Sequence, residues 1–224
     1  QIMGLKSGLF DRVVSHIKSA MEIKKRDNLA CTVNMQLVSM PKDADQLLPF
    51  AKLAASIRPT YAVIKHCADS RDNELGVDYG QYKDIFDVLR ACEALSDEEF
   101  RVAVKWSRLE DEGKRDYKEC YGPNFILQMS GNGLIAPCGQ LFNEKYKKMH
   151  IGNICETRFK DIFESPRYKE VMDWLASEHW DSRSMCGPNC LQHSSNKYLD
   201  RLQKGLISLP DLDGMKPPPH LGFI

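Results

Sequence analysis

The chain has 224 residues, which is enough to bury one large or two small hydrophobic cores. Its 31 basic and 31 acidic residues balance, so the composition gives no basic field for nucleic acid or for an anionic membrane. No apolar run approaches the roughly 20 residues that span a bilayer. The N-terminus lacks the pattern of a secretory signal. We therefore expect a cytoplasmic protein with neither a nucleic-acid nor a membrane partner.

The first half of the chain alternates helical and strand patterns. Apolar residues at helical spacing predict a helix over residues 9–21, and residues 29–38 favour a strand. Residues 43–57 predict a second helix with Asp45 as its N-cap, and residues 61–64 predict another strand. Two strands flanking a helix with short links indicate a βαβ unit with parallel strands.

The pattern continues as far as a charged stretch in the middle of the chain. Residues 79–95 predict a helix. Ser96-Asp-Glu-Glu99 resembles a capping box, but alternating apolar residues over 100–106 favour a strand instead. The charged, glycine-containing stretch 108–119 predicts a linker. We thus expect an α/β domain over residues 1–107.

The second half opens with a β-hairpin. Residues 125–129 and 134–136 flank Ser-Gly-Asn-Gly, and Asn-Gly is a preferred two-residue hairpin turn. Residues 158–163 predict a short helix, and Ser165-Pro166 predicts the capped start of another. A last helix is expected over 198–206, and residues 207–224 read as an extended tail.

Cysteines gather around this second half. Eight cysteines at irregular spacing, in a chain this long and without a signal, indicate reduced thiols rather than a disulfide scaffold. A hairpin brings its ends together, so Cys120 and Cys138 can be neighbours, while Gly187-Pro188 lets Cys186 and Cys190 face one centre. Four thiolates complete either a tetrahedral zinc site or one [4Fe–4S] cluster.

The alternative is that these four cysteines are buried small hydrophobes, since free cysteine is among the most buried residue types. For the other cysteines we expect structural roles. Cys31 and Cys92 fall within periodic segments and are predicted core residues. Cys67, at the end of a predicted strand, and Cys155, after the Gly-Asn-Ile turn, are less clearly assigned to a structural role.

Two further features invite a functional interpretation. Cys186-x3-Cys190-x2-His193 mimics the C-x3-C-x2-C loop of radical S-adenosylmethionine (SAM) enzymes, but such a loop should precede the barrel strands. We therefore expect His193 to be solvated or hydrogen-bonded. Polar residues on the predicted parallel strands form a second candidate pocket; they are Asn34, Gln36, Lys65 and His66.

Several motifs together resemble a known family. They are Cys120-x17-Cys138, Gly152-Asn-Ile154, Phe159-Lys-Asp-Ile-Phe-Glu-Ser165-Pro-Arg-Tyr168 and Cys186-x3-Cys190. This order is similar to the C-terminal SPASM or shorter twitch domain of radical SAM enzymes. The resemblance implies a small α+β SPASM/twitch-like domain over residues 120–206. It also implies that the upstream half is the later part of a partial (β/α)6 barrel.

The resemblance implies a chemistry as well. Radical SAM enzymes cleave SAM to a 5′-deoxyadenosyl radical that abstracts a substrate hydrogen, and the auxiliary [4Fe–4S] cluster accepts an electron or seats the substrate. Substrates are peptides, carbohydrates or other small molecules, and an external donor such as flavodoxin or ferredoxin supplies electrons. Asn34 and Gln36 are the candidate SAM contacts.

The chain departs from the family pattern in two ways. No cysteine follows Cys190, which favours one auxiliary cluster over two, and no C-x3-C-x2-C loop precedes the strands. We expect a truncated chain that is inactive by itself. The competing hypotheses are a non-catalytic zinc-binding module and an iron–sulfur electron carrier without SAM chemistry.

Overall fold

The computed structural model describes residues 8–188, 190–211 and 213–214. The chain divides into two compact units. Unit 1 comprises Gln1–Ala68 and Gly76–Glu112, and unit 2 comprises Asp69–Leu75 and Gly113–Ile224. Most of the predicted tail, from residue 215 onward, lies outside the described residues. None of the described helices combines the length and the apolar character needed to cross a membrane.

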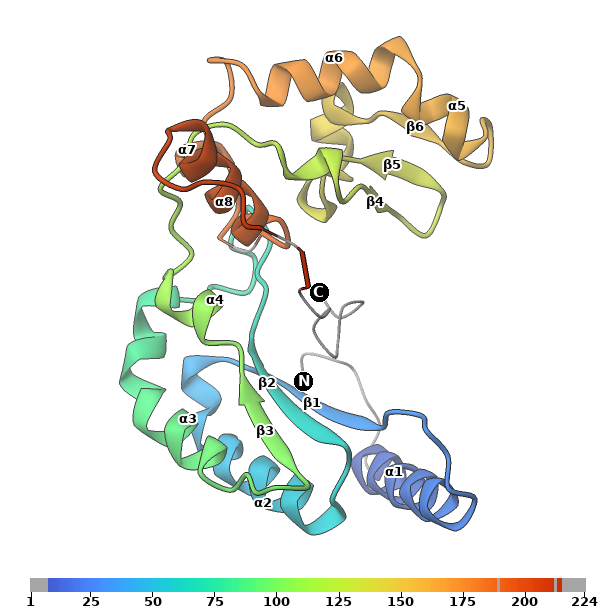
Figure 1. The fold of residues 1–224 in the computed structure, drawn as a ribbon, viewed down its shortest axis with the longest axis vertical. Coiled ribbons are helices and arrows are strands. Elements are labelled where there is room, and N and C mark those ends of the chain that lie inside the picture. Colours follow the sequence, from blue (N-terminus) through green and yellow to red (C-terminus); the bar gives the residue numbers. More distant parts are fainter. Residues whose placement is uncertain (1–7, 189, 212, 215–224) are drawn as a thin grey trace. The chain divides into compact units, whose positions relative to one another are not determined.

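Unit 1 is built on three parallel strands in the order β1–β2–β3 (Figure 1). They are β1 (Asn34–Ser39), β2 (Tyr61–His66) and β3 (Arg101–Val104). Strands β1 and β2 pair along their whole length, from Asn34 opposite Tyr61 to Ser39 opposite His66. The predicted parallel βαβ unit is therefore confirmed, and the mixed α/β class with it; the partial barrel remains a prediction.

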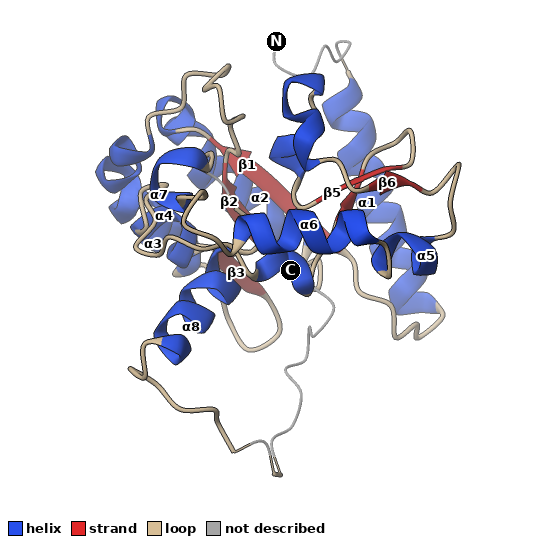
Figure 2. Cartoon of the chain, turned by 90° about the horizontal axis from the view of Figure 1, so that it is seen from above, coloured by secondary structure: helices blue, strands red, loops and turns tan. Residues whose placement is uncertain are grey.

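Helices α2 (Leu47–Ile57) and α3 (Phe86–Glu93) connect these strands and pack against each other and the sheet (Figures 1 and 2). The largest fully buried side chain of this core is Tyr82, in the 3₁₀ turn before α3. Its hydroxyl donates to Ser39 O (2.6 Å) and accepts from Cys67 N (2.9 Å). Tyr82 thus joins the carboxyl end of β1 to the residue that follows β2.

The start of α2 differs from the prediction. Asp45 is not an N-cap, because the 3₁₀ turn Pro41–Gln46 precedes α2 and contains it. Pro41 begins this turn with its φ already set for a helix, and Gln46 then leads into α2 without a side-chain cap. Pro49 lies in the first turn of α2, as predicted, where its missing N–H has no intrahelical acceptor.

Helix α1 (Leu9–Arg26) forms as predicted and is longer; none of its described residues is buried, and Phe10 is 69% exposed. Of the two cysteines predicted to be core residues, one is buried and one is not. Cys31 was expected in the core but is exposed, because β1 begins only at Asn34. Cys92, on the inner face of α3, is fully buried as predicted.

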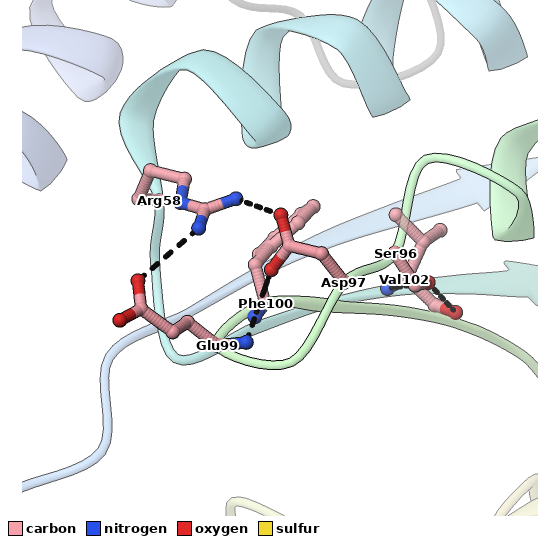
Figure 3. A network of polar contacts seen from close by, with 6 residues as sticks. All are labelled: Arg58, Ser96, Asp97, Glu99, Phe100 and Val102. Atoms are coloured by element: carbon pink, nitrogen blue, oxygen red, sulfur yellow. Dashed lines mark hydrogen bonds and ion pairs between the residues drawn. The ribbon is translucent and has the colours of Figure 1, made fainter.

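The turn before β3 shows why the apparent capping box starts no helix (Figure 3). Ser96 Oγ accepts a hydrogen bond from a backbone N–H of β3 (3.0 Å). Asp97 Oδ1 accepts from the N–H groups of Glu99 and Phe100, both at 3.0 Å. Arg58, which ends α2 at a φ of +59°, pairs with Asp97 and Glu99. The side chains of Ser96 and Asp97 thus accept hydrogen bonds from backbone N–H groups of the turn and of β3, so no helix begins here.

After β3, the helix α4 (Trp106–Glu110) overlaps the beginning of the predicted linker, residues 108–119. Unit 2 then opens with the predicted hairpin, in which β4 (Gln128–Met129) pairs antiparallel with β5 (Leu134–Ala136). A third strand that the sequence did not indicate, β6 (Gly152–Asn153), pairs with β5. Gly133 permits this turn because its φ is +83° and a Cβ there would lie 2.6 Å from Asn153 Oδ1.

Four helices complete unit 2: α5 (Phe159–Phe163), α6 (Pro166–Leu175), α7 (Ser182–Met185) and α8 (His193–Gln203). Helix α5 lies beside β6 and α6 (Figures 1 and 2). Ser165 caps α6 as predicted, since its Oγ accepts from Tyr168 N (3.1 Å). Helix α7 was not predicted, and α8 begins at His193 rather than near Tyr198. Cys120 lies in the hydrophobic core of this unit.

Candidate metal centre

The site begins at Cys120, which is 7% exposed. Its backbone N–H donates to Leu175 O (3.0 Å), which ties it to the end of α6. Gly122, two residues on, lets the start of α8 approach: a Cβ at this position would lie 2.5 Å from Gln192 Cβ, closer than real Cβ atoms come. A side chain at this glycine would therefore push Gln192 away from the site.

Cys138 directly follows the hairpin, and Gln192 holds the two ends of that hairpin together. The amide of Gln192, 1% exposed, donates from Nε2 to Ile126 O (2.6 Å) and Pro137 O (2.9 Å). Ile126 precedes β4 and Pro137 follows β5. One buried side chain therefore fixes the hairpin end that carries Cys138.

The late cysteine pair stands on a loop after α7. Cys186 leaves that helix in extended backbone, at φ −86° and ψ 151°. Arg115 fixes the backbone of this loop, because its Nη2 donates to Gly187 O (3.0 Å) and to Pro188 O (2.9 Å). These two hydrogen bonds keep the loop that carries Cys186 and Cys190 against the segment that leads to Cys120.

The cysteines converge on one cavity of about 200 Å³, lined by Cys138, Cys186 and Cys190. Cys120 lies within electrostatic reach of them: burial raises the pKa of its thiol, and Cys186 and Cys190 raise it further. The structure thus brings together the four cysteines that the sequence singled out.

Burial sets the charge state of these thiols. It raises the pKa of Cys138 to about 12 and the pKa of Cys186 to about 11, with neighbouring thiols as secondary causes. At neutral pH, without a metal, Cys138 and Cys186 are therefore protonated. A bound metal centre would take the place of those protons, because thiolate is the form that ligates.

The sulfur of Cys120 receives a hydrogen bond, because Asn196 Nδ2 donates to Cys120 Sγ (3.4 Å). Gln140 and Ser182 act in the same direction on the other thiols, since they lower the pKa of Cys138 and Cys186 against the larger rise from burial. Asn196 is 1% exposed, and its Oδ1 accepts from the N–H groups of residues 121 and 122 at 2.8 and 2.7 Å. Such donors stabilise negative charge on ligand sulfurs and help to set a cluster's potential.

The spacing of the donors bears on the kind of centre. In a tetrahedral zinc site with Zn–S of about 2.3 Å, the sulfurs lie roughly 3.8 Å apart. Within the described residues, no three histidine, cysteine or carboxylate side chains are arranged to hold a single metal ion. A [4Fe–4S] cluster binds each thiolate through a different iron and accommodates a wider set. Four thiols are a donor set that suits either a zinc ion or an iron–sulfur cluster.

Comparison with known families agrees with this geometry. Residues 120–191 match the family model of the SPASM iron–sulfur cluster-binding domain. The matched stretch includes all four converging cysteines. A search of curated proteins returned no match to the chain.

The second candidate site is not brought together as one pocket. Asn34 lies at the amino end of β1, where its Nδ2 donates to the Tyr61 hydroxyl (3.2 Å), and Gln36 is exposed. Lys65 and His66 lie at the carboxyl end of β2. Asn34 and His66 are separated by five residue pairs of the ladder, or about 16 Å.

His193 is buried, and its Nδ1 lies 3.0 Å from the Tyr117 hydroxyl, in agreement with the expected hydrogen-bonded histidine. Three other side chains near the cysteines were not predicted. Gln192 and Asn196 share one helix face at i, i+4 spacing just after Cys190, a signal that could have marked them. Arg71, which lines the cavity, has no such local signal.

Proposed function

We propose that Cys120, Cys138, Cys186 and Cys190 hold one auxiliary [4Fe–4S] cluster in a radical SAM enzyme of the SPASM or twitch type. The observation that carries this proposal is the gathering of four thiols, from distant points of the chain, inside the stretch that matches the SPASM model. Support also comes from the hydrogen bond that Asn196 donates to the sulfur of Cys120.

A bound cluster supplies a one-electron acceptor and donor. The protein supplies its surroundings. Leu141, Trp180 and Met185 line the cavity and would lower the polarity around a bound cluster, which strengthens charge interactions there. Asn196 would stabilise negative charge on the sulfur of Cys120.

The proposal for unit 1 follows from the same family. Its parallel sheet would form part of the barrel that binds SAM, with Asn34 and Gln36 as the candidate contacts. The substrate would be a peptide, a carbohydrate or another small molecule, and flavodoxin or ferredoxin would supply electrons. This part of the proposal is tested by 5′-deoxyadenosine formation, and by a C-x3-C-x2-C loop encoded ahead of β1 in the same reading frame.

The cluster is tested by measuring iron, acid-labile sulfide and zinc per chain after anaerobic purification and reconstitution. We expect about four irons and four sulfides per chain. Cys186→Ala should lose them. Cys155→Ala is the matched control, because Cys155 lies in the same matched stretch but is exposed. Stoichiometric zinc without sulfide would refute the proposal and favour a structural zinc module.

A further inference from the structure

The segment Asp69–Leu75 follows β2 in sequence but belongs to unit 2. Gln140, just after Cys138, holds it by two hydrogen bonds: Arg71 N donates to Gln140 Oε1 (2.7 Å), and Gln140 Nε2 donates to Asp69 O (3.3 Å). The Asp69 carboxylate is buried and accepts from Ser70 N (2.7 Å) and Leu75 N (3.0 Å). The backbone of this segment is thus fixed beside the cysteine site.

Arg71 lies directly against the late cysteine loop. A Cβ at Gly187 would come within 3.1 Å of Arg71 Cα and 3.3 Å of Arg71 N, so the two backbones are in close contact. Arg71 lines the same cavity as Cys138, Cys186 and Cys190. Its guanidinium carbon lies 5.2 Å from the centre of the Tyr146 ring.

The charge of Arg71 is not neutralised nearby. Within the described part of the chain no carboxylate forms an ion pair with Arg71, and the adjacent Asp72 pairs with Lys145 instead. The other guanidinium at the site, that of Arg115, is engaged by the carbonyls of the cysteine loop.

We propose that Arg71 compensates the negative charge of the centre held by the four cysteines and thereby raises its reduction potential. Reduction adds one electron to a centre already surrounded by thiolates, so a nearby positive charge favours the reduced form. This inference rests on the proposed cluster. It gives a role in that site to a residue outside the matched stretch 120–191.

The test is an anaerobic redox titration of the reconstituted chain, followed by electron paramagnetic resonance, with iron and sulfide measured on each sample. Arg71→Gln removes the charge and Arg71→Lys retains it. Arg158→Gln is the matched control, because this arginine of unit 2 is exposed and pairs with Asp161. At a fixed ambient potential, Arg71→Gln should lower the ratio of reduced to oxidised cluster about tenfold, a fall of about 59 mV in the midpoint.

Each outcome decides the matter. A lowered potential in Arg71→Gln with a near wild-type value in Arg71→Lys supports the proposal. So does a cluster that Arg71→Lys retains and Arg71→Gln loses. An unchanged midpoint potential in Arg71→Gln overturns the proposal. Equal loss of the cluster, or an equal shift of the midpoint potential, in Arg71→Gln and Arg71→Lys also overturns it, because the shape of arginine and not its charge would then matter. Absence of a cluster from the wild-type chain would overturn the proposed function as well.

Discussion

Asn196→Ala is expected to destabilise unit 2 strongly, because Asn196 supports the base of the cysteine site with three hydrogen bonds. The variant leaves the backbone N–H groups of Tyr121 and Gly122 without their acceptor. Gly122 is buried and Tyr121 half-buried. An orphaned buried donor costs about 1–3 kcal/mol, so the loss in unfolding free energy should be about 3 kcal/mol.

The assay is urea unfolding of the reduced, metal-free chain, followed by the fluorescence of Trp174 and Trp180, which belong to the core of unit 2. With an m-value of about 2 kcal/mol/M, the midpoint should fall by roughly 1.5 M. Asn196→Asp keeps an oxygen that can accept hydrogen bonds from both N–H groups, so its unfolding midpoint should fall clearly less than that of Asn196→Ala.

Arg201→Ala, at an exposed position of the same helix, serves as the control and should change the unfolding free energy by less than about 0.5 kcal/mol. An Asn196→Ala variant as stable as this control would refute the reasoning. Equal destabilisation by Asp and Ala would show that the acceptor role of Asn196 is not what matters.

Three further predictions concern local structure. Gly133→Ala should destabilise the hairpin by about 1–2 kcal/mol because of its positive φ, whereas Gly131→Ala, with nothing within 4 Å, should be nearly neutral by urea unfolding. Ser165→Ala should cost about 1 kcal/mol through loss of the cap of α6, measured the same way. The hydrogen bond from Arg183 lowers the pKa of Asp181 to about 2, so the stabilisation from this pair is present above pH 4 and is lost as pH falls through 2. An NMR titration should show that midpoint, and Arg183→Gln should move it upward.

The elements that were predicted correctly have their determinants within a few residues. The hairpin follows from the turn residues between its strands, although its loop comprises residues 131–133, closed by the hydrogen bond from Ser130 N to Leu134 O (2.9 Å), rather than the predicted two-residue Asn-Gly turn. The start of α6 follows from Ser165-Pro166. Parallel pairing of β1 and β2 followed from the short links around α2, which leave no room for another arrangement. In each case the local backbone preference and the tertiary structure agree.

The failures have non-local causes. Cys31 was predicted to be buried because it lies in the run 29–38 that favours a strand, but β1 itself begins only at Asn34. For the site, the four cysteines could be read from spacing and resemblance, but Arg71 could not, because its position depends on Gln140 from a distant part of the chain.

The charge of the cysteine site links its burial to its chemistry. Cys120, Cys138 and Cys186 all have a raised thiol pKa, first because they are buried and further because of neighbouring thiols. Four thiolates buried together would repel each other strongly unless cations offset them. The proposed cluster would supply most of that positive charge, and its binding would release the thiol protons. The hydrogen bond from Asn196 and the guanidinium of Arg71 would then stabilise the negative charge that remains.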